Sequence, residues 1–477
     1  RERSDWCISR QRHWGLPIPV FYCEECGRPV CTPETIEVVA ELFAEHGSNV
    51  WYEKEAAEIL PEGFVCPHCG GKTFTKETDT LDGWFDSGST HAGVLDKFEG
   101  LAFPADIYLE GGDQYRGWFQ SSMLTSIAAK GVAPYRQIIT HGWTVDGEGK
   151  AMHKSLGNVV APEEIIKDYG ADILRLWVAS TDYRNDMRMS KEILKQLSDI
   201  YLKIRNTARY ILGNLCGFNP DEALPFEELE ELDKWAVAEF NKLVARVRAA
   251  YDRYEYHTIY HGIHNFCAVE MSSFYLDVIK DRLYCDAVDS FSRRSAQSAI
   301  FTILDGLVRL LAPILAFTAE EIWAAMPHRA GDDTESVLFN DMPDFNPALV
   351  LAPEREEQWE KLLNLRDDVN KALELARAEK VIGKPLDAEV TIYLDEEGAK
   401  AFESIKDENL SLLFIVSKVT AVRGSGAGYA AQAFKGAVIE VKASTAPKCV
   451  RCWVHDERVG ECAEHPQLCP RCAAAIS

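Results

Sequence analysis

Apolar residues follow two different patterns in the first third and in the middle of the chain. Up to about residue 155 they form short runs, such as residues 107–109 and 137–140, and each run is followed by a polar loop that contains glycine. Short apolar runs bounded by glycine are typical of strands that alternate with helices. The pattern therefore predicts an α/β domain over residues 1–189.

The middle of the chain has a helical pattern. From residue 190 onward apolar residues recur at steps of three and four, which places them on one face of an α-helix. Similar stripes follow near Trp235 and over 259–283, and Thr318 with Glu321 predicts a capping box before another helix. We therefore expect a helical bundle over residues 190–328. Its first stripe consists of Ile193, Leu194, Leu197, Ile200, Tyr201, Ile204, Ala208, Ile211 and Leu212.

The last part of the chain is more varied. Proline and aspartate are frequent in residues 329–353, which predicts a linker. Residues 354–445 are predicted to form a small α+β module, and residues 446–477 form a cysteine-rich tail. A helix and three strands are expected in the module, at residues 354–380, 390–394, 412–416 and 437–441. A chain of 477 residues with these shifts in pattern predicts several domains.

Eight of the 14 cysteines occur in four Cys-x-x-Cys pairs. Two residues between thiolates allow one tight turn to direct both sulfurs at a single tetrahedral ion, and two such pairs complete a closed, structural zinc site. One group lies in a zinc ribbon of about residues 23–75 and the other in the tail, so we expect about two zinc ions per chain. The expected ligands are Cys23, Cys26, Cys66, Cys69, Cys449, Cys452, Cys469 and Cys472.

Other roles for the cysteines remain open at this point. A Cys-x-x-Cys pair can be redox-active, although such a pair normally occurs once and not in matched groups. Cys31, Cys462, His68 and His455 lie close enough in sequence to compete as zinc ligands. The four remaining cysteines are expected to be core thiols. They are Cys7, Cys216, Cys267 and Cys285.

Composition and charge exclude some classes of protein. The chain is 47% apolar and 26% charged and contains no run of about 18 apolar residues, which excludes a membrane protein. Its net charge of −24 argues against a general nucleic-acid binder, so any RNA contact must be local. The cysteine usage, without an export signal, favours a reducing cytoplasm. Because the first residue is Arg1, we expect an internal start.

One loop, residues 145–158, combines lysines with glycines. Gly147 and Gly149 can act as hinges for Lys150 and Lys154. A mobile lysine can close over a triphosphate and stabilise the charge that develops as pyrophosphate leaves. A loop of this composition is usually only a solvated turn. Its context makes it informative, because three further motifs precede it, at residues 9–19, 83–88 and 110–119.

These motifs, in this order, resemble those of the second half of a class I aminoacyl-tRNA synthetase of the bacterial isoleucyl type, in which the loop is the KMSKS signature. The resemblance extends over nearly the whole chain. The valyl type is similar, but its first motif resembles SRQLWWG where this chain has SRQRHWG at residues 9–15. The valyl type also typically ends in a coiled coil instead of a four-cysteine tail.

The resemblance implies a multidomain fold with α/β and α parts. Residues 1–189 would be the C-terminal half of a Rossmann-type catalytic domain with a zinc-ribbon insertion, and 190–328 an anticodon-binding bundle. The module at 354–445 would be a junction, followed by the four-cysteine zinc tail. The implied reaction is activation of isoleucine by ATP, with Mg²⁺, to isoleucyl-adenylate, followed by transfer to tRNA(Ile). We expect a monomer.

Site residues follow from the resemblance, motif by motif. Trp84 and Trp118 would wall the pocket for the isoleucine side chain, although both could simply pack in a core. His141 would touch the nucleotide or serve as a structural histidine. Lys154 and Ser155 would keep the chemistry of the loop, which must then face the aromatic pocket. The adenylate would be lined by Glu110, Gly111, Asp113 and Gln114.

The chain departs from the family pattern at two points. Ala151 and His153 replace the first lysine and the middle serine of KMSKS, and Lys150, one position earlier, would partly substitute. In addition, the sequence has no HIGH-type segment, because the three histidines within 257–264 have the spacing of a helix face in the bundle. We therefore expect the HIGH half to precede Arg1 and the fragment to be inactive alone.

Isoleucyl-tRNA synthetase is itself a standard example of an enzyme whose pocket rejects valine too weakly and which needs a second, hydrolytic site. That editing insertion is also expected to precede Arg1 and to be absent from this chain. Two alternatives to the assignment stay open here. One is a stand-alone tRNA-binding zinc protein without catalysis, and the other is the corresponding part of a valyl-tRNA synthetase.

Two groups of basic residues could contact tRNA locally. The first group lies along the first predicted helix of the bundle, and the second lies in the cysteine-rich tail. The second group combines cations with one tryptophan, a composition that suits phosphate contact and base stacking. Solvated surface charge is an equally good interpretation of any one of these residues. The groups are Lys191, Lys195, Lys203, Arg205 and Arg209, and Lys448, Arg451, Trp453, Arg458 and Arg471.

Overall fold

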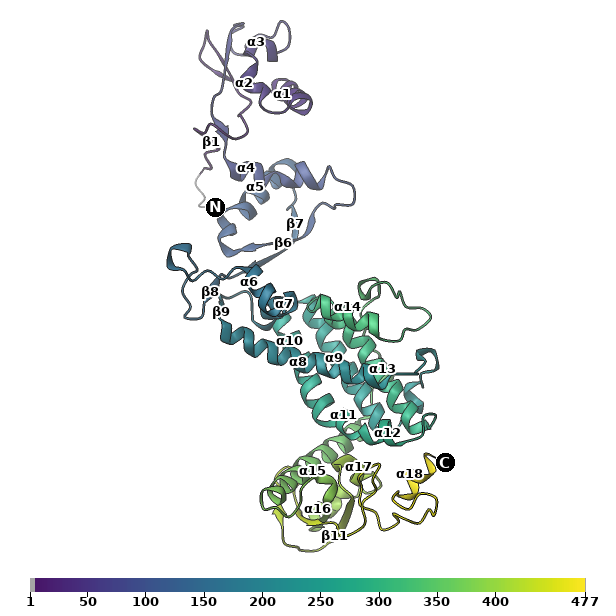
Figure 1. Ribbon diagram of the computed structural model, residues 1–477. Coiled ribbons are helices and arrows are strands. Elements are labelled where there is room, and N and C mark those ends of the chain that lie inside the picture. The colour runs from purple at the N-terminus through teal and green to yellow at the C-terminus, as the bar shows by residue number, and fades with distance from the viewer. Residues whose placement is uncertain (1–4, 477) are drawn as a thin grey trace. The chain divides into compact units, whose positions relative to one another are not determined.

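The computed structural model describes residues 5–476 (Figure 1). The chain divides into two compact units. The first unit contains Arg1–Trp143 together with Arg184–Asp186. The second contains Thr144–Tyr183 and Met187–Ser477. Each unit has buried residues of its own, and we describe each by itself.

The first unit contains the lobe that was predicted as a zinc ribbon, which we call the ribbon. Its three-stranded antiparallel sheet has the order β3-β2-β4, and three helices complete the lobe. Phe21 and Trp51 are buried at its centre with their rings 5.2 Å apart, so the ribbon has an apolar core in addition to its cysteines. The elements are β2 (Phe21–Cys23), β3 (Pro29–Val30), α1 (Pro33–His46), α2 (Val50–Glu53), α3 (Ala56–Ile59) and β4 (Phe74–Lys76).

The rest of the first unit is an α/β segment. Strand β1 (Ser9–Arg10) pairs with β5 (Thr80–Leu81), and β5 is followed directly by α4 (Gly83–Gly88). Strands β6 (Ala105–Gly111) and β7 (Tyr135–His141) are parallel, and α5 (Trp118–Lys130) connects them. The two strands predicted at 107–109 and 137–140 are therefore confirmed. Single turns of other helix types lie at η1 (His91–Leu95) and η2 (Gly112–Arg116).

The second unit begins with the lysine-bearing loop and not with the bundle. Strand β8 (Thr144–Asp146) pairs in parallel with β9 (Met187–Met189), and α6 (Pro162–Tyr169) and α7 (Ala171–Ser180) lie between them in sequence. Helix α7 is attached to the bundle, because Arg175 donates to the carbonyl oxygen of Ile314 at 2.9 Å. The compact division falls after residue 143, within the predicted domain of residues 1–189.

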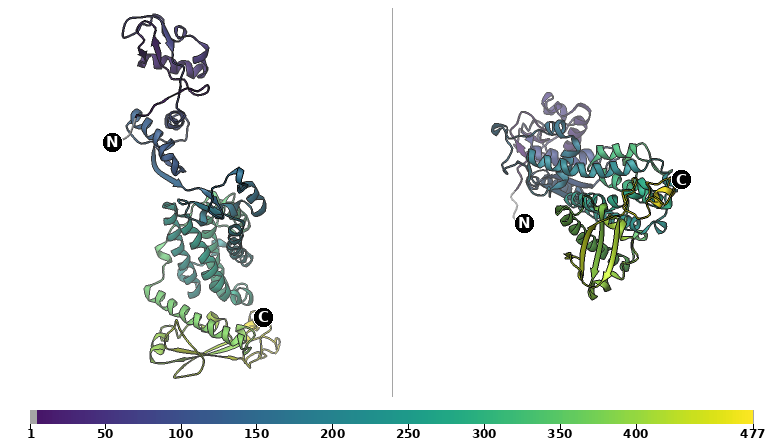
Figure 2. Two further views of the ribbon diagram at one scale, coloured as in Figure 1. Left: turned by 90° about the vertical axis from the view of Figure 1, so that its left-hand side faces the viewer. Right: turned by 60° about the horizontal axis from the view of Figure 1, so that its bottom comes forward.

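The bundle follows the predicted stripe. Helix α8 buries Leu194, Leu197, Ile204, Ala208 and Ile211 on one face, as the three- and four-residue spacing requires. The helices of the bundle pack against one another (Figures 1 and 2). They are α8 (Lys191–Asn214), α9 (Glu231–Asp252), α10 (Tyr256–Asn265), η6 (Phe266–Tyr275), α11 (Leu276–Val278), α12 (Lys280–Cys285), α13 (Phe291–Leu311) and α14 (Ala316–Ala325).

The capping box predicted from Thr318 and Glu321 is wrong. Helix α14 begins at Ala316, so Thr318 lies inside its first turn. The cap comes instead from Asp172 on α7, whose carboxylate accepts hydrogen bonds from the backbone N–H groups of Phe317 and Thr318 at 3.3 and 2.7 Å. A carboxylate that is distant in sequence therefore caps this helix in place of the predicted local residues.

The segment expected to be a linker is folded against the bundle. Asn241 of α9 donates to the carbonyl oxygen of Asn346 at 2.8 Å and accepts from its N–H at 2.9 Å. Val337 is also buried. Residues 329–353 therefore form an ordered strap, which includes the short turns η7 (Val337–Phe339) and η8 (Pro347–Leu349).

The α+β module is a four-stranded sheet of order β11-β10-β13-β12, against which α15 packs (Figure 2). The predicted helix and two of the three predicted strands are confirmed by α15, β10 and β13. The strand predicted at 412–416 is wrong: the side chain of Asn409 caps a helix there, and its residues Leu413 and Phe414 are buried. The elements are α15 (Pro353–Ala378), β10 (Ala388–Leu394), α16 (Glu396–Phe402), α17 (Leu410–Phe414), β11 (Lys418–Arg423), β12 (Tyr429–Ala430) and β13 (Ala437–Ala443).

The tail after β13 contains one short helix, α18 (Pro470–Ala474). It lies beside α12 of the bundle, because Arg471 of α18 is paired with Asp281 of α12. Among residues 5–476, none of the helices combines the length and the apolar character needed to cross a bilayer.

Candidate active-site residues and metal centres

The predicted adenylate residues gather at one edge of the first unit. Strands β6 and β7 are parallel and in register, with Glu110 opposite Thr140 and Gly111 opposite His141. Their carboxyl ends therefore meet at the same edge. In parallel α/β sheets this is the edge at which ligands bind.

The turn after β6 links three of the predicted residues through one side chain. Gln114 accepts a hydrogen bond from the backbone N–H of Trp118 at 3.0 Å and donates to Asp113 at 3.1 Å. Gly111 leaves no room for a side chain, because a Cβ atom there would lie 2.7 Å from a carboxylate oxygen of Asp113. The turn is therefore fixed by its own contacts.

The two predicted pocket tryptophans lie next to the same turn. Trp118 stacks on Tyr108 with ring centroids 4.1 Å apart, and its indole N–H donates to the carbonyl oxygen of Ser87 at 2.9 Å. Trp84 is 44% exposed, which does not fit simple core packing. Its ring lies over Gly117, where a Cβ atom would meet it at 2.9 Å. One tryptophan is thus held rigidly and the other presents an open face.

Asp82 is a residue that sequence reasoning missed. It is buried, caps α4 by accepting from the N–H of Trp84 at 3.1 Å, and also accepts from the indole of Trp6 and the guanidinium of Arg10. It therefore joins the motif at 9–19 to the helix that carries Trp84. The available signal was an aspartate directly before a helix start.

His141 is hydrogen-bonded to its own neighbour. Its Nδ1 lies 2.8 Å from the carbonyl oxygen of Gly142, which can only accept, so Nδ1 donates this hydrogen bond. Gly142 itself lies against the backbone of Asn185, where a Cβ atom would be 2.3 Å from the carbonyl carbon. The ring orientation is set by these local contacts.

The lysine-bearing loop belongs to the second unit. Lys154 and Ser155 lie in a 3-10 turn, η3 (Lys154–Leu156), and both are exposed. Lys150 is also exposed and forms an ion pair with Glu148 at 2.7 Å. The structure thus brings the adenylate and tryptophan residues together in the first unit, and the loop residues together in the second.

The ribbon cysteines form one tetrahedral set. Their sulfurs all lie within 4.8 Å of one another, with Cys23 and Cys69 3.6 Å apart and Cys26 and Cys66 3.8 Å apart. Zn–S bonds of about 2.3 Å separate tetrahedral sulfurs by about 3.8 Å, so the set fits zinc. Burial raises the pKa of the Cys66 thiol, but hydrogen bonds from backbone N–H groups outweigh this effect and lower the pKa to about 7. A lower pKa favours the thiolate, which is the form that binds metal.

The tail cysteines form a second set with the same dimensions. Cys452 and Cys469 are 3.8 Å apart, and all four ligands, including Cys449 and Cys472, are buried. Cys285 of α12 belongs to the same buried cluster. Burial raises the pKa of the Cys449 thiol, but hydrogen bonds from backbone N–H groups outweigh this effect and lower the pKa to about 6. Both sets are closed, because four thiolates leave no position for a substrate.

The remaining cysteines divide differently from our expectation. Cys267 and Cys285 are buried, as predicted for core thiols, but Cys7 and Cys216 are exposed, so that interpretation is wrong for them. Cys216 lies in a turn just beyond the end of α8. Among the described residues, none of the four competing ligands joins either sulfur set. They were Cys31, Cys462, His68 and His455.

Several predicted tRNA-binding cations are engaged in intramolecular contacts. Arg471 is paired with Asp281 of α12, at 2.7 Å for one of its two bonds, and Arg451 donates to the carbonyl oxygen of Cys285. Arg205 is paired with Glu321 at 3.0 Å. Two of the five tail residues therefore attach the tail to the bundle.

The aromatic residue of the tail patch remains open to solvent. Trp453 is 55% exposed, adopts a positive φ of 66°, and has the ammonium of Lys384 5.2 Å from its ring centroid. Lys448 is paired with Asp387 at 3.0 Å and Arg458 with Asp456 at 2.8 Å. An exposed indole beside cations retains the composition that suits a nucleotide base.

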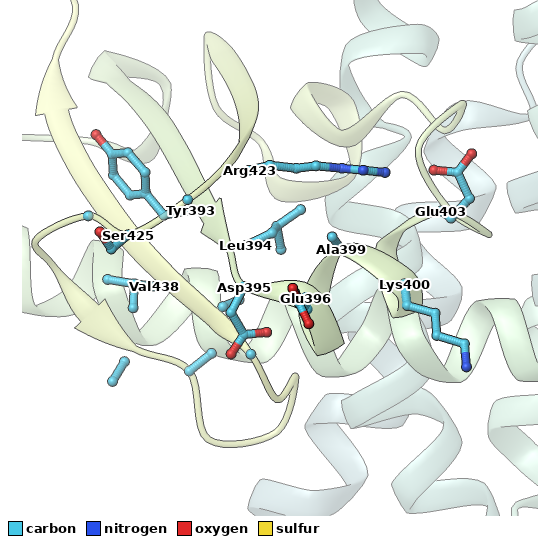
Figure 3. Close-up of a pocket in the computed structure, with 16 residues that line it drawn as sticks. Tyr393, Leu394, Asp395, Glu396, Ala399, Lys400, Glu403, Arg423, Ser425 and Val438 are labelled. Carbon is cyan, nitrogen blue, oxygen red and sulfur yellow. The ribbon is translucent and has the colours of Figure 1, made fainter.

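A pocket of about 1070 Å³ lies elsewhere, in the α+β module, at the carboxyl ends of the parallel strands β10 and β11 (Figure 3). Figure 3 shows Arg423 extending toward Glu403 on its rim. Its charges are mixed, because Lys400 and Arg423 line it together with Asp395 and Glu403. None of the predicted site residues lines this pocket.

Three family models match separate parts of the chain. Residues 1–190 match the model for tRNA synthetases class I (I, L, M and V). Residues 233–392 match the anticodon-binding domain of tRNA ligase. Residues 447–475 match the zinc finger found in FPG and IleRS, which contains the second cysteine set.

Curated relatives match the whole chain. An isoleucine–tRNA ligase from Caldanaerobacter subterraneus subsp. tengcongensis is 52% identical and is matched over 100% of this chain and 51% of its own length. One from Syntrophotalea carbinolica is 53% identical, also over 100% of this chain and 51% of its length. The chain therefore spans about half the length of these relatives. They do not favour the valyl alternative.

Among solved structures, the LeuRS–tRNA–LeuAMS complex from Agrobacterium radiobacter K84 matches with a TM-score of 0.54 at 20% identity, over 82% of this chain and 44% of that chain. This likeness supports the fold alone. The curated relatives and the three family models together show that the chain belongs to the isoleucine–tRNA ligase family of class I aminoacyl-tRNA synthetases.

Proposed function

We propose that this chain is part of an isoleucine–tRNA ligase, which activates isoleucine with ATP and transfers it to tRNA(Ile). The observation that carries the proposal is identity of about one half, over the full length of the chain, to curated isoleucine–tRNA ligases. The remaining part of the enzyme supplies the HIGH segment and the editing site. The chain alone is then inactive in adenylate formation.

In this proposal the first unit holds the activated amino acid. Trp84, with its open face, and Trp118, held by Tyr108, contact the branched side chain of isoleucine. The edge formed by the ends of β6 and β7 accepts the nucleotide, where Asp113 suits ribose hydroxyls and Gln114 the aminoacyl or ribose portion. Glu110, Gly111 and His141 complete the set.

The loop of the second unit supplies the cation. Lys154 stabilises the negative charge that develops as pyrophosphate leaves, and it forms no covalent bond. Ser155 donates a hydrogen bond to the same phosphates. Lys150 partly replaces the lysine that Ala151 lacks, after it leaves Glu148. Mg²⁺ accompanies ATP as its substrate partner.

The helical bundle and the tail bind tRNA(Ile) in this proposal. The anticodon-binding and zinc-finger family matches support this division. The contact is local, because the chain as a whole carries a net charge of −24. We also propose that the enzyme is a cytoplasmic monomer with one zinc ion in each cysteine set, which light scattering and metal analysis would test.

The test is amino-acid-dependent exchange of pyrophosphate into ATP by the complete enzyme. We expect exchange with isoleucine, which falls at least about 100-fold in Lys154→Ala, because an electrostatic group aimed at the transition state is lost. Trp84→Ala should raise the KM for isoleucine. Preferential exchange with valine, or none with any amino acid, would refute the proposal.

A further inference from the structure

Two side chains hold the lysine-bearing loop, and no motif gave either of them a role. Asp146, at the end of β8, accepts hydrogen bonds from the backbone N–H groups of Glu148 at 3.0 Å and Lys150 at 2.9 Å. Its second oxygen accepts from the side-chain amide of Asn158 at 2.8 Å. The start and the end of the loop are therefore joined through one carboxylate.

Asn158 uses both ends of its amide. Its oxygen accepts from the backbone N–H of His153 at 2.9 Å, and its nitrogen also donates to the carbonyl oxygen of Ala151 at 3.1 Å. Both contacts lie on the segment that leads into Lys154. Hydrogen bonds from Asn158 and from the N–H of Lys150 lower the pKa of Asp146, so the carboxylate is charged at neutral pH and its bonds are strengthened.

The turn that follows has a fixed backbone and free functional groups. The N–H of Leu156 donates to His153 at 3.0 Å, that of Gly157 donates to Lys154 at 3.2 Å, and Gly157 adopts a φ of 64°. Within residues 5–476, the Lys154 ammonium and the Ser155 hydroxyl are exposed and make no hydrogen bond or ion pair. A rigid support under unengaged side chains is what a group aimed at a ligand requires.

We propose that Asp146 and Asn158 are positioning residues, which hold the Lys154–Leu156 turn in one shape before the triphosphate arrives. The inference rests on the proposed function and deepens it. A charge that is already in place stabilises a transition state without the cost of reorganisation. The side-chain hydrogen bonds of Asp146 and Asn158 all go to residues of the loop, so their effect reaches the reaction through Lys154 and Ser155.

The kinetic test uses the complete enzyme and Asn158→Ala. The kcat of isoleucine-dependent pyrophosphate exchange should fall about 10- to 100-fold, because a misplacement of about 1 Å is enough for such a loss. The KM for isoleucine should stay unchanged, since the tryptophan pocket is untouched. A kcat within about twofold of the wild type would overturn the inference, since even the low end of the loss expected from misplacement is larger.

A matched control exists in the same unit. Asn219 also holds a 3-10 turn with its side chain, accepting from the N–H of Asp221 at 3.2 Å and donating to Glu222 at 3.0 Å. Asn219→Ala should leave kcat unchanged. An equal fall in both variants would mean that loss of turn stability, and not the position of the loop, explains the effect.

Exchanging the two groups tests the contact itself. Asp146→Asn and Asn158→Asp should each lower kcat, because each single change breaks the complementary pair. The double variant restores an amide-to-carboxylate bond between positions 146 and 158 and should recover part of the loss. Additive losses in the double variant would contradict a direct contact.

Proteolysis of the chain tests the loop without any activity. Trypsin should cleave Asn158→Ala after Lys150 or Lys154 several-fold faster than the wild type or Asn219→Ala. Unchanged cleavage together with unchanged kcat would refute the inference and leave the proposed function intact. If the wild-type complete enzyme shows no exchange with isoleucine, the proposed function itself fails, whatever the cleavage result.

Discussion

The two cysteine sets have the same four ligands and the same dimensions, yet they are embedded differently. The ribbon set packs on a core from its own lobe, which includes Phe21 and Trp51. The tail set packs on Cys285 of the bundle, and Arg451 and Arg471 attach the tail to α12. Identical metal chemistry therefore stabilises a local lobe in one case and a contact between two segments distant in sequence in the other.

The difference follows from where apolar surface is available. The ribbon contains three helices and buries aromatic rings in a core made of its own residues. The tail has a single five-residue helix, so its sulfurs supply most of its interior and α12 supplies the rest. Small domains that cannot build a core depend on metal or on a neighbour.

The largest expected effect is on the tail set. Cys472→Ser should reduce the zinc content from about two ions per chain to about one and unfold the tail, because binding and folding are one process at such sites. Amide hydrogen exchange should then increase in 446–476 and also in α12. Cys69→Ser is the matched variant: it should also lose one zinc ion, but with changes confined to the ribbon. Increased exchange in α12 in the ribbon variant would break the comparison.

A large effect on stability is also expected where α12, the helix that contacts the tail, packs on the rest of the bundle. Arg282 of α12 is buried and paired with the buried Asp233 at 2.6 Å. Asp233→Ala should lower the free energy of unfolding by about 3 kcal/mol, because the buried guanidinium loses its closest carboxylate and keeps only Glu230, 3.2 Å away. Chemical denaturation of the second unit measures this. A loss below about 1 kcal/mol, far under that expected for a broken buried pair, would mean that α12 is held mainly by the tail.

The surface attachment of the tail should contribute less. Arg471→Ala removes the pair with Asp281, which is partly exposed, so the expected loss is at most about 1 kcal/mol in overall stability. Hydrogen exchange in the tail should nevertheless rise. Arg458→Ala, which removes a pair within the tail, is the control. If both variants behave alike, docking through Arg471 does not hold the tail.

The smallest effect is a pH dependence. Hydrogen bonding to Lys448, which tethers the start of the tail, lowers the pKa of Asp387. A carboxyl whose folded pKa lies below its unfolded value, about 3.9, stabilises the fold above that value and loses this contribution as pH falls through the folded pKa. Tail exchange should therefore increase more steeply below about pH 4 in the wild type than in Asp387→Asn. Parallel profiles would exclude this tether.

Patterns that act within one segment could be predicted from the sequence. The Cys-x-x-Cys pairs carry their own geometry, and the helical stripe of 193–212 is long enough to identify its buried face. The residues predicted at the ends of β6 and β7 also lie together, because parallel strands bring their ends to one edge. The ligand roles of these residues stay predictions.

Features that depend on distant partners could not be predicted. Asp172 caps a helix that lies far along the chain, at Thr318. Residues 412–416 form a short apolar run, as a buried strand would, but the Asn409 cap and packing against α15 make most of it helical. Arg451 and Arg471 suited RNA by composition, and only the fold shows that α12 engages them. The expectation that the lysine-bearing loop faces the pocket of Trp84 and Trp118 also stays a prediction.

The most direct test of the account is aminoacylation of tRNA(Ile) by the complete enzyme with isoleucine and with valine. We expect stable isoleucyl-tRNA, and its rate of formation should fall in Lys154→Ala without loss of tRNA affinity, since the bundle and tail are unchanged. Valyl-tRNA as the main product, or charging that is indifferent to Lys154, would contradict the account.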